Sequence, residues 1–93
     1  MRVIWAPAAR QDLGRIDDYL ADRDAEFARV AGRAALTAAE FLSVNPFAGS
    51  PIARTRRKWR VNGSPYLLVY RIRADIVEIL RIRHEREDWR SQP

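Results

Sequence analysis

The stretch YLLVYRIRADIVEILRIRH, residues 66–84, decides the fold. Aliphatic, β-branched and aromatic side chains dominate it on both sides of Ala74-Asp75, which predicts two antiparallel strands joined by a tight turn. With a two-residue turn there, Arg71 falls opposite Glu78, a complementary cross-strand pair. The same register sorts the apolar side chains by face, with Leu67, Val69, Leu80 and Ile82 on one and Tyr66, Leu68, Tyr70, Ile72, Val77 and Ile79 on the other. Both faces are largely apolar, so we expect central strands of a sheet.

The first half of the chain follows a helical period instead. Val3-Ile4-Trp5 is a short β-prone run, and Pro7 suits the first turn of a helix. Asp24 is a suitable N-cap for a second helix, which we expect to run to about Ser43. We expect the apolar stripes of the two helices to consist of Ala9, Leu13, Ile16 and Leu20, and of Phe27, Val30, Ala31, Ala34, Ala38 and Phe41. The short link between them predicts an antiparallel hairpin.

The complete order of elements is β-α-α-β-β-β, an α+β fold. Residues 45–51 are rich in Pro and Gly and predict a loop, after which residues 56–61 predict a strand and Asn62-Gly63 a hairpin turn. We expect a helical hairpin packed on a mainly antiparallel sheet, with the first strand joining the late strands. The whole chain, residues 1–93, forms a single domain, and residues 85–93 are expected to be a mobile tail.

Composition excludes several classes of protein. The 93 residues include no cysteine, which excludes disulfides, thiolate chemistry and cysteine-based zinc sites. The N-terminus lacks the apolar run of a signal peptide, and no stretch approaches the roughly 18 apolar residues of a membrane span. Neither a dinucleotide-binding nor a Walker motif is present. We therefore expect a cytoplasmic protein that uses no cofactor and no membrane.

The charge is distributed unevenly along the chain. Residues 1–46 carry six Arg against seven Asp and Glu, whereas residues 47–93 carry ten Arg and Lys58 against five acidic residues. The basic half predicts an acidic partner, either nucleic acid or an acidic protein segment. Its densest part is residues 54–60, in which Arg56, Lys58 and Arg60 would form a stripe on one side of a strand. A solvated strand edge that deters aggregation is the alternative interpretation.

Residues with catalytic chemistry are few. His84 is the single histidine, and it cannot hold a metal unaided. It could act as a general acid or base, or simply complete a hydrogen bond at a strand end. The serines lie in or beside predicted loops without the context of a nucleophile. Trp89, in the charged tail, needs a docking surface on the sheet or on a partner.

Several segments together resemble the ParE/RelE family of toxins. They are Val3-Ile4-Trp5 followed by Ala8-Ala9-Arg10-Gln11-Asp12-Leu13, the loop Asn45-Pro46-Phe47-Ala48-Gly49, the run from Arg60 to Arg71, and the run from Val77 to Trp89. The resemblance covers nearly the whole chain in the right order. It implies a compact α+β toxin that is held in check by an antitoxin, whose C-terminal segment wraps around it.

The superfamily has two branches. RelE-like members cut messenger RNA on the ribosome and typically carry Gly-Tyr-Arg where this chain has Pro65-Tyr66-Leu67. ParE-like members poison DNA gyrase, and the runs around Tyr70 and His84 look more like theirs. The resemblance therefore implies a gyrase inhibitor without catalytic residues and a ParD-like antitoxin with an acidic C-terminal segment. Direct nucleic-acid binding is secondary in this interpretation.

The candidate site residues follow from this interpretation. We predict target binding by Arg81, Arg83, Arg86 and Trp89, and antitoxin binding by Arg57 and Arg60. The alternative is a ribosome-dependent endonuclease with Arg71, Arg83, His84 and Arg86 as its catalytic residues. A plasmid-maintenance protein without toxicity is a third class.

Overall fold

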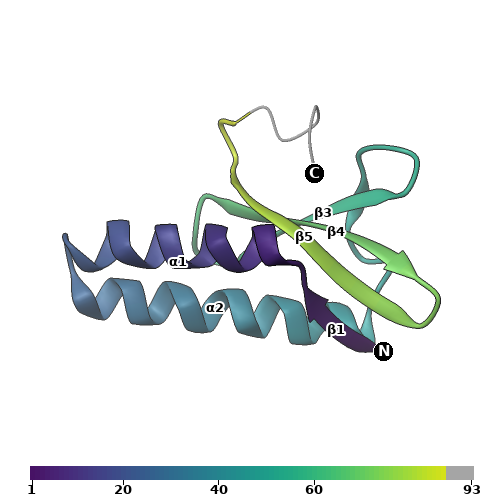
Figure 1. Ribbon diagram of the computed structural model, residues 1–93, viewed down its shortest axis with the longest axis horizontal. Helices are drawn as coiled ribbons and strands as arrows, with labels where there is room; N and C mark the ends of the chain where they lie inside the picture. Colours follow the sequence, from purple (N-terminus) through teal and green to yellow (C-terminus); the bar gives the residue numbers. More distant parts are fainter. Residues whose placement is uncertain (88–93) are drawn as a thin grey trace.

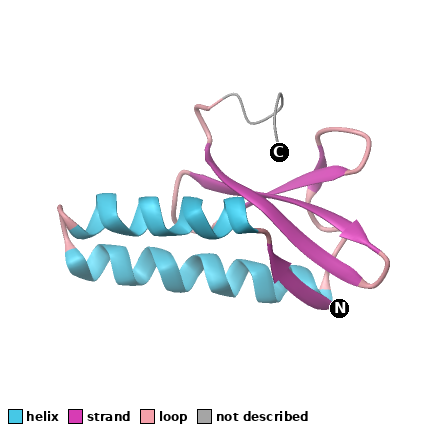
Figure 2. Cartoon of the chain, in the orientation of Figure 1, coloured by secondary structure: helices cyan, strands magenta, loops and turns pink. Residues whose placement is uncertain are grey.

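A pair of antiparallel helices covers one face of a five-stranded sheet (Figures 1 and 2). The computed structural model describes residues 1–87. Its elements are β1 (Arg2–Trp5), α1 (Pro7–Ala21), α2 (Ala25–Val44), β2 (Ser50–Pro51), β3 (Arg56–Arg60), β4 (Tyr66–Arg73) and β5 (Ile76–His84). The predicted class and element order are confirmed. The two-residue strand β2 was not predicted. It lies within the predicted loop, residues 45–51, and pairs with Arg57 and Lys58 of β3.

The strand order is β1-β5-β4-β3-β2, so the first strand does join the last. β1 runs parallel to β5, and the other neighbouring pairs are antiparallel. β5 and β4 are the longest strands. Both lie inside the sheet, as their two apolar faces predict. β1 stops opposite Ile79, and the outer edge of β5 beyond that point faces α1 instead of a strand.

The predicted register holds only up to the middle of the hairpin. Arg71 lies opposite Glu78 and its Nε donates to Glu78 Oε1 over 2.7 Å, which confirms that pairing. A β-bulge then intervenes, since Tyr70 pairs with Ile79 but Val69 pairs with Arg81, and Leu80 is the extra residue. Beyond the bulge Ile82 lies opposite Leu68 and joins the core on the helix side. The prediction that Ile82 shares a face with Leu67 and Val69 is therefore wrong, because one inserted residue exchanges the two faces.

The helices begin as predicted, but α2 buries a different face. Asp24 caps α2, because its carboxylate accepts hydrogen bonds from the backbone N–H groups of Glu26 and Phe27. The buried side chains of α2 are small, apart from one leucine: Ala28, Ala35, Ala38, Ala39 and Leu42. From the predicted stripe only Ala38 is fully buried, and Phe27, Val30 and Phe41 are about half exposed. Small side chains let α2 approach α1 and the sheet closely, and this turns the large ones toward solvent.

The loop after α2 is fastened to the core by one tyrosine. Tyr70 is completely buried, and its hydroxyl accepts from the Gly49 N–H (2.9 Å) and donates to the Pro46 carbonyl (2.8 Å). Burial raises the pKa of this phenol, so it keeps the proton that it donates. Gly49 is required at this approach, because a Cβ there would lie 2.5 Å from the Tyr70 oxygen and 2.6 Å from the Lys58 carbonyl oxygen.

Gly49→Ala is therefore expected to lower the free energy of unfolding by about 1–3 kcal/mol, since neither neighbour is a flexible chain end. The matched control is Gly14→Ala in α1, where an added Cβ meets nothing within 4 Å. That control should be neutral or stabilising by up to about 1 kcal/mol. Urea denaturation of both variants measures the difference. Equal stability of the two variants would contradict this account of the loop.

Candidate functional site

A buried carboxylate joins the first helix to the last strand. Asp12 is 2% exposed, and its Oδ2 accepts from Arg81 Nε (2.8 Å) and from the Ile82 backbone N–H (2.9 Å). Its Oδ1 accepts from Arg81 Nη2 (2.9 Å) and also pairs with Arg15. The Ile82 N–H lies beyond the end of β1, so Asp12 supplies the acceptor that β1 does not reach.

The electrostatics of Asp12 favour its charged form. Burial by itself would raise the pKa of this carboxyl group. The hydrogen bonds from Arg81 and Ile82, together with the charges of Arg81 and Arg15, outweigh that effect and lower the pKa below its ordinary value. Sequence reasoning missed this residue as a site. The available signal was an acidic side chain on the apolar stripe of α1, three residues after Ala9 and four before Ile16.

The predicted target-binding residues differ in how accessible their charges are. The Arg81 side chain is 20% exposed and its guanidinium is paired with Asp12, so the role of Arg81 in this structure is to join β5 to α1. The Arg83 side chain is 13% exposed, and its Nη1 lies 3.3 Å from Glu87. Arg86 is exposed. Trp89 lies outside the described residues.

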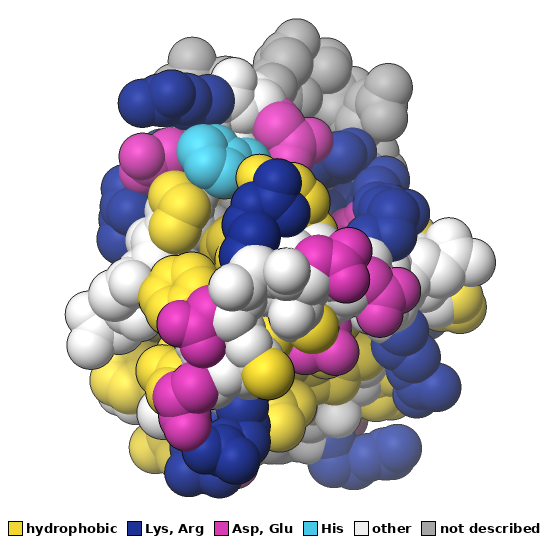
Figure 3. Space-filling view, turned by 90° about the vertical axis from the view of Figure 1, so that its left-hand side faces the viewer, with side chains coloured by type: hydrophobic (Ala, Val, Ile, Leu, Met, Phe, Trp, Pro, Cys, Tyr) yellow, Lys and Arg dark blue, Asp and Glu magenta, His cyan; other side chains and the backbone are white. Residues whose placement is uncertain are grey.

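A groove of about 530 Å³, lined by both polar and apolar side chains, lies between the helical hairpin and the end of β5. Tyr19 and Phe27 line it from the hairpin, and Tyr66, Arg83 and His84 from the sheet. Figure 3 looks onto the hairpin tip and shows the histidine above hydrophobic side chains, with acidic side chains over the tip itself.

His84 is held in place within this groove. Its Nδ1 accepts from the Arg86 N–H, its ring packs edge-on against Tyr66, and its backbone N–H donates to Glu87. Across residues 1–87 no three His, Asp or Glu side chains are grouped as metal ligands would be.

The structure does not gather the residues of the endonuclease alternative into one place. Tyr66 is opposite His84 whereas Arg71 is opposite Glu78, so Arg71 lies five residues further along β4. That separation is roughly 17 Å along the strand. Arg83 and His84 end β5 and line the same groove, and the backbone N–H of Arg86 bonds to His84. Leu67 is the β4 residue opposite Arg83.

The predicted basic stripe is present on β3, but two arginines of this strand, Arg57 and Arg60, also hold neighbouring loops in place. Arg56, Lys58 and Arg60 lie opposite Arg71, Val69 and Leu67 and alternate along one face of β3. Arg57 belongs to the opposite face, where its Nη1 donates to the carbonyls of Gly49 (2.6 Å) and Phe47 (3.2 Å). Arg60 donates to the Ser64 carbonyl and pairs with Glu85. Both predicted antitoxin-binding residues therefore also fasten loops.

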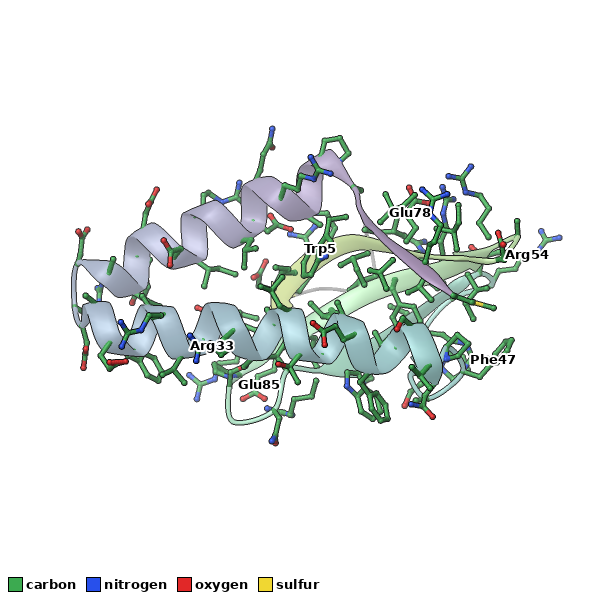
Figure 4. All side chains as sticks on the ribbon, turned by 90° about the horizontal axis from the view of Figure 1, so that it is seen from below. Trp5, Arg33, Phe47, Arg54, Glu78 and Glu85 are labelled. Carbon is green, nitrogen blue, oxygen red and sulfur yellow. The ribbon has the colours of Figure 1, made fainter. Side chains whose placement is uncertain are left out.

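A second groove, of about 680 Å³, separates α2 from β3. The Phe41 and Trp59 rings stack in it with centroids 5.0 Å apart, while Thr37 lines it and Arg33 and Arg60 flank it. Arg33 lies midway along α2 on the side seen in Figure 4. Phe27, Val30 and Val44 extend the exposed apolar surface along the same helix. An apolar groove with cationic borders suits an amphipathic partner with acidic flanks.

The comparisons with known proteins agree with this architecture. The model of the ParE toxin family of type II toxin–antitoxin systems matches residues 3–89. A chromosomal ParDE system from P. aeruginosa has a TM-score of 0.80 at 24% identity, covering 90% of this chain and 95% of that one. The RelBE2 toxin–antitoxin complex from Mycobacterium tuberculosis has a TM-score of 0.66 at 28% identity, covering 89% and 95%. No curated protein gives a significant match.

The helical hairpin packed on this five-stranded sheet is the fold of ParE/RelE-like toxins. The chain belongs to the ParE toxin family and is the toxin of a type II toxin–antitoxin system. The predicted family is confirmed, and an antitoxin is its partner. Within residues 1–87, none of the helices has the length and hydrophobicity needed to cross a membrane.

Asp12→Asn should lower the free energy of unfolding by about 2–3 kcal/mol at pH 7, because it leaves Arg81 partly buried without its counter-charge. The folded-state pKa of Asp12 is depressed, so its contribution is present above the ordinary range of about pH 4 and is lost as the pH falls through the folded pKa. The gap between wild type and variant should therefore close below about pH 4. Denaturant titrations at several pH values test this. Asp17→Asn, at an exposed position of α1, is the control, and a gap independent of pH would contradict the assignment.

Proposed function

We propose that this toxin acts as a ParE-like inhibitor of DNA gyrase, by binding and without catalysis of its own. The observation that carries the proposal is Leu67, a buried apolar residue opposite Arg83 on β4. The endonuclease branch that the sequence resembles has an arginine at that position. Metal-free cleavage of RNA needs a base, an acid and cations around one phosphate. Arg71 is too far along β4 to complete such a group with His84.

A ribosome-dependent messenger-RNA endonuclease is the second candidate. Arg83 and His84 end β5, and Arg86 follows two residues later. The RelBE2 complex is 28% identical to this chain, against 24% for the ParDE system described above. Nδ1 of His84 already accepts a hydrogen bond from the Arg86 N–H, which argues against this nitrogen as a catalytic base.

The antitoxin is proposed to be ParD-like and to use an acidic, amphipathic C-terminal segment. The groove between α2 and β3 supports this choice of partner, because Phe41 and Trp59 offer an apolar floor. Arg33 and Arg60 provide cations for acidic flanks, while Arg57 steadies the neighbouring loop. Covering half-exposed aromatic side chains would stabilise both the complex and the toxin itself.

Purified toxin should inhibit supercoiling of relaxed plasmid by gyrase, or trap cleaved DNA, and leave ribosome-bound messenger RNA intact. His84→Ala should keep most of the inhibition, because no step in a binding mechanism requires that imidazole. The measurement places a supercoiling reaction beside a translation reaction with equal toxin. Cleavage of messenger RNA together with normal supercoiling would assign the chain to the endonuclease branch instead.

Thr37→Glu should weaken the toxin–antitoxin complex about tenfold or more, because it places a carboxylate inside the groove proposed for an acidic partner. Leu36→Glu is the matched control, since it adds the same charge one residue away on α2 at an exposed position outside the groove. Affinity for the antitoxin encoded beside the toxin is measured by calorimetry. Equal weakening by the two variants would remove the groove from the proposal.

A further inference from the structure

A shallow hollow of about 280 Å³ lies at the end of the sheet away from the hairpin tip. Its lining includes Phe47, Pro51, Arg54, Arg56, Arg57 and Ile72. Figure 4 labels Phe47 and Arg54 and shows both at this end of the molecule. The hollow shares no lining residue with the groove beside His84 or with the groove between α2 and β3, and the proposed gyrase inhibition does not use it.

One wall of the hollow is an aromatic ring held ready for contact. Phe47 is 67% exposed, yet its loop is fixed at three points. The Tyr70 hydroxyl bonds to Pro46 and Gly49, and Arg57 donates to the carbonyls of Phe47 and Gly49. The Arg57 guanidinium also lies 5.2 Å from the centre of the Phe47 ring. A ring carried by an already fixed backbone requires less ordering of the chain when a ligand stacks on it.

The other walls carry positive charge in excess. Arg56 lies directly opposite Arg71, and like charges in that position repel each other. The carboxylate of Glu78 offsets part of the positive charge at this end of the sheet, but it is shared between Arg71 (2.7 Å) and Arg73 (3.6 Å). Among residues 1–87 no carboxylate lies within ion-pair distance of Arg54 or Arg56.

The molecule is electrically polarised along its length. The tip of the helical hairpin is acidic on balance, because residues 17–26 carry five acidic side chains against one cation, Arg23. The arginines of the hollow lie at the other end. Such an arrangement turns the basic end toward a polyanion as the two approach.

We propose that this hollow binds single-stranded nucleic acid. Arg54 and Arg56 hold successive phosphodiesters, and an unpaired base stacks on Phe47. Guanidinium groups beside one exposed aromatic ring are the elements of a stacking platform for single strands. A duplex keeps its bases stacked on each other and cannot present one to Phe47. An acidic peptide would satisfy the arginines but would leave the ring without a flat partner, and the hollow is too shallow to enclose its side chains.

The test measures binding of the isolated, full-length toxin, so its outcome is independent of gyrase. Fluorescence anisotropy follows four labelled probes of equal charge: a single-stranded DNA, the same strand without bases, a duplex, and a Glu-rich peptide. The variants are Phe47→Ala and the double variant Arg54→Ser/Arg56→Ser. Arg10→Ser/Arg29→Ser, at exposed positions of the helical hairpin, is the control with the same change of charge. Thermal melts check that each variant is folded.

We expect the single strand to bind most tightly. Phe47→Ala should weaken that binding about tenfold and leave the abasic strand unaffected. Removing the two arginines should flatten the plot of log affinity against log salt by about 1.4, because each phosphate contact contributes about 0.7. Equal effects of the two double variants, tightest binding of the duplex or of the peptide, or indifference to Phe47→Ala would each overturn the proposal.

Discussion

The ion pair between Asp12 and Arg81 is the constraint on which the surfaces of this toxin depend. It joins residues 69 positions apart and holds α1 against the edge of β5 at the point where β1 ends. This contact ties the hairpin to the sheet, and the groove beside His84 and the groove between α2 and β3 lie between those two layers. Removing either partner alone would leave a buried charge without compensation, so the two residues depend on each other.

The fold was largely predictable because its signals are local. The β-prone runs in residues 66–84, the pairing of Arg71 with Glu78, Pro7 at a helix start and Asp24 as a cap each act within a few residues. The bulge at Leu80 was not predictable, since an extra apolar residue leaves the pattern of an apolar strand unchanged. The buried face of α2 was misassigned because large side chains were expected inside, whereas close helix packing here selects alanine.

The candidate site was predictable in composition but not in detail. The excess of arginine in the second half of the chain is visible in the sequence, yet the partner of each guanidinium is not. Arg57 and Arg60 fasten loops, and Arg81 is bound by a residue of α1. Arg54 and Arg56 lie within the same dense run, but only the cross-strand register reveals that Arg56 faces another arginine. Contacts between distant segments decide which charges remain available.

On α2, the residues that pack the core are different from the residues that form the exposed apolar surface. Apart from Leu42, its fully buried side chains are alanines, while Phe27, Val30 and Phe41 are about half exposed. Mutations of the outward residues change the exposed apolar surface without opening a cavity in the core. The outer surface of α2 can therefore vary in sequence more freely than the core beneath it, because exposed positions carry few of the packing contacts that hold the fold.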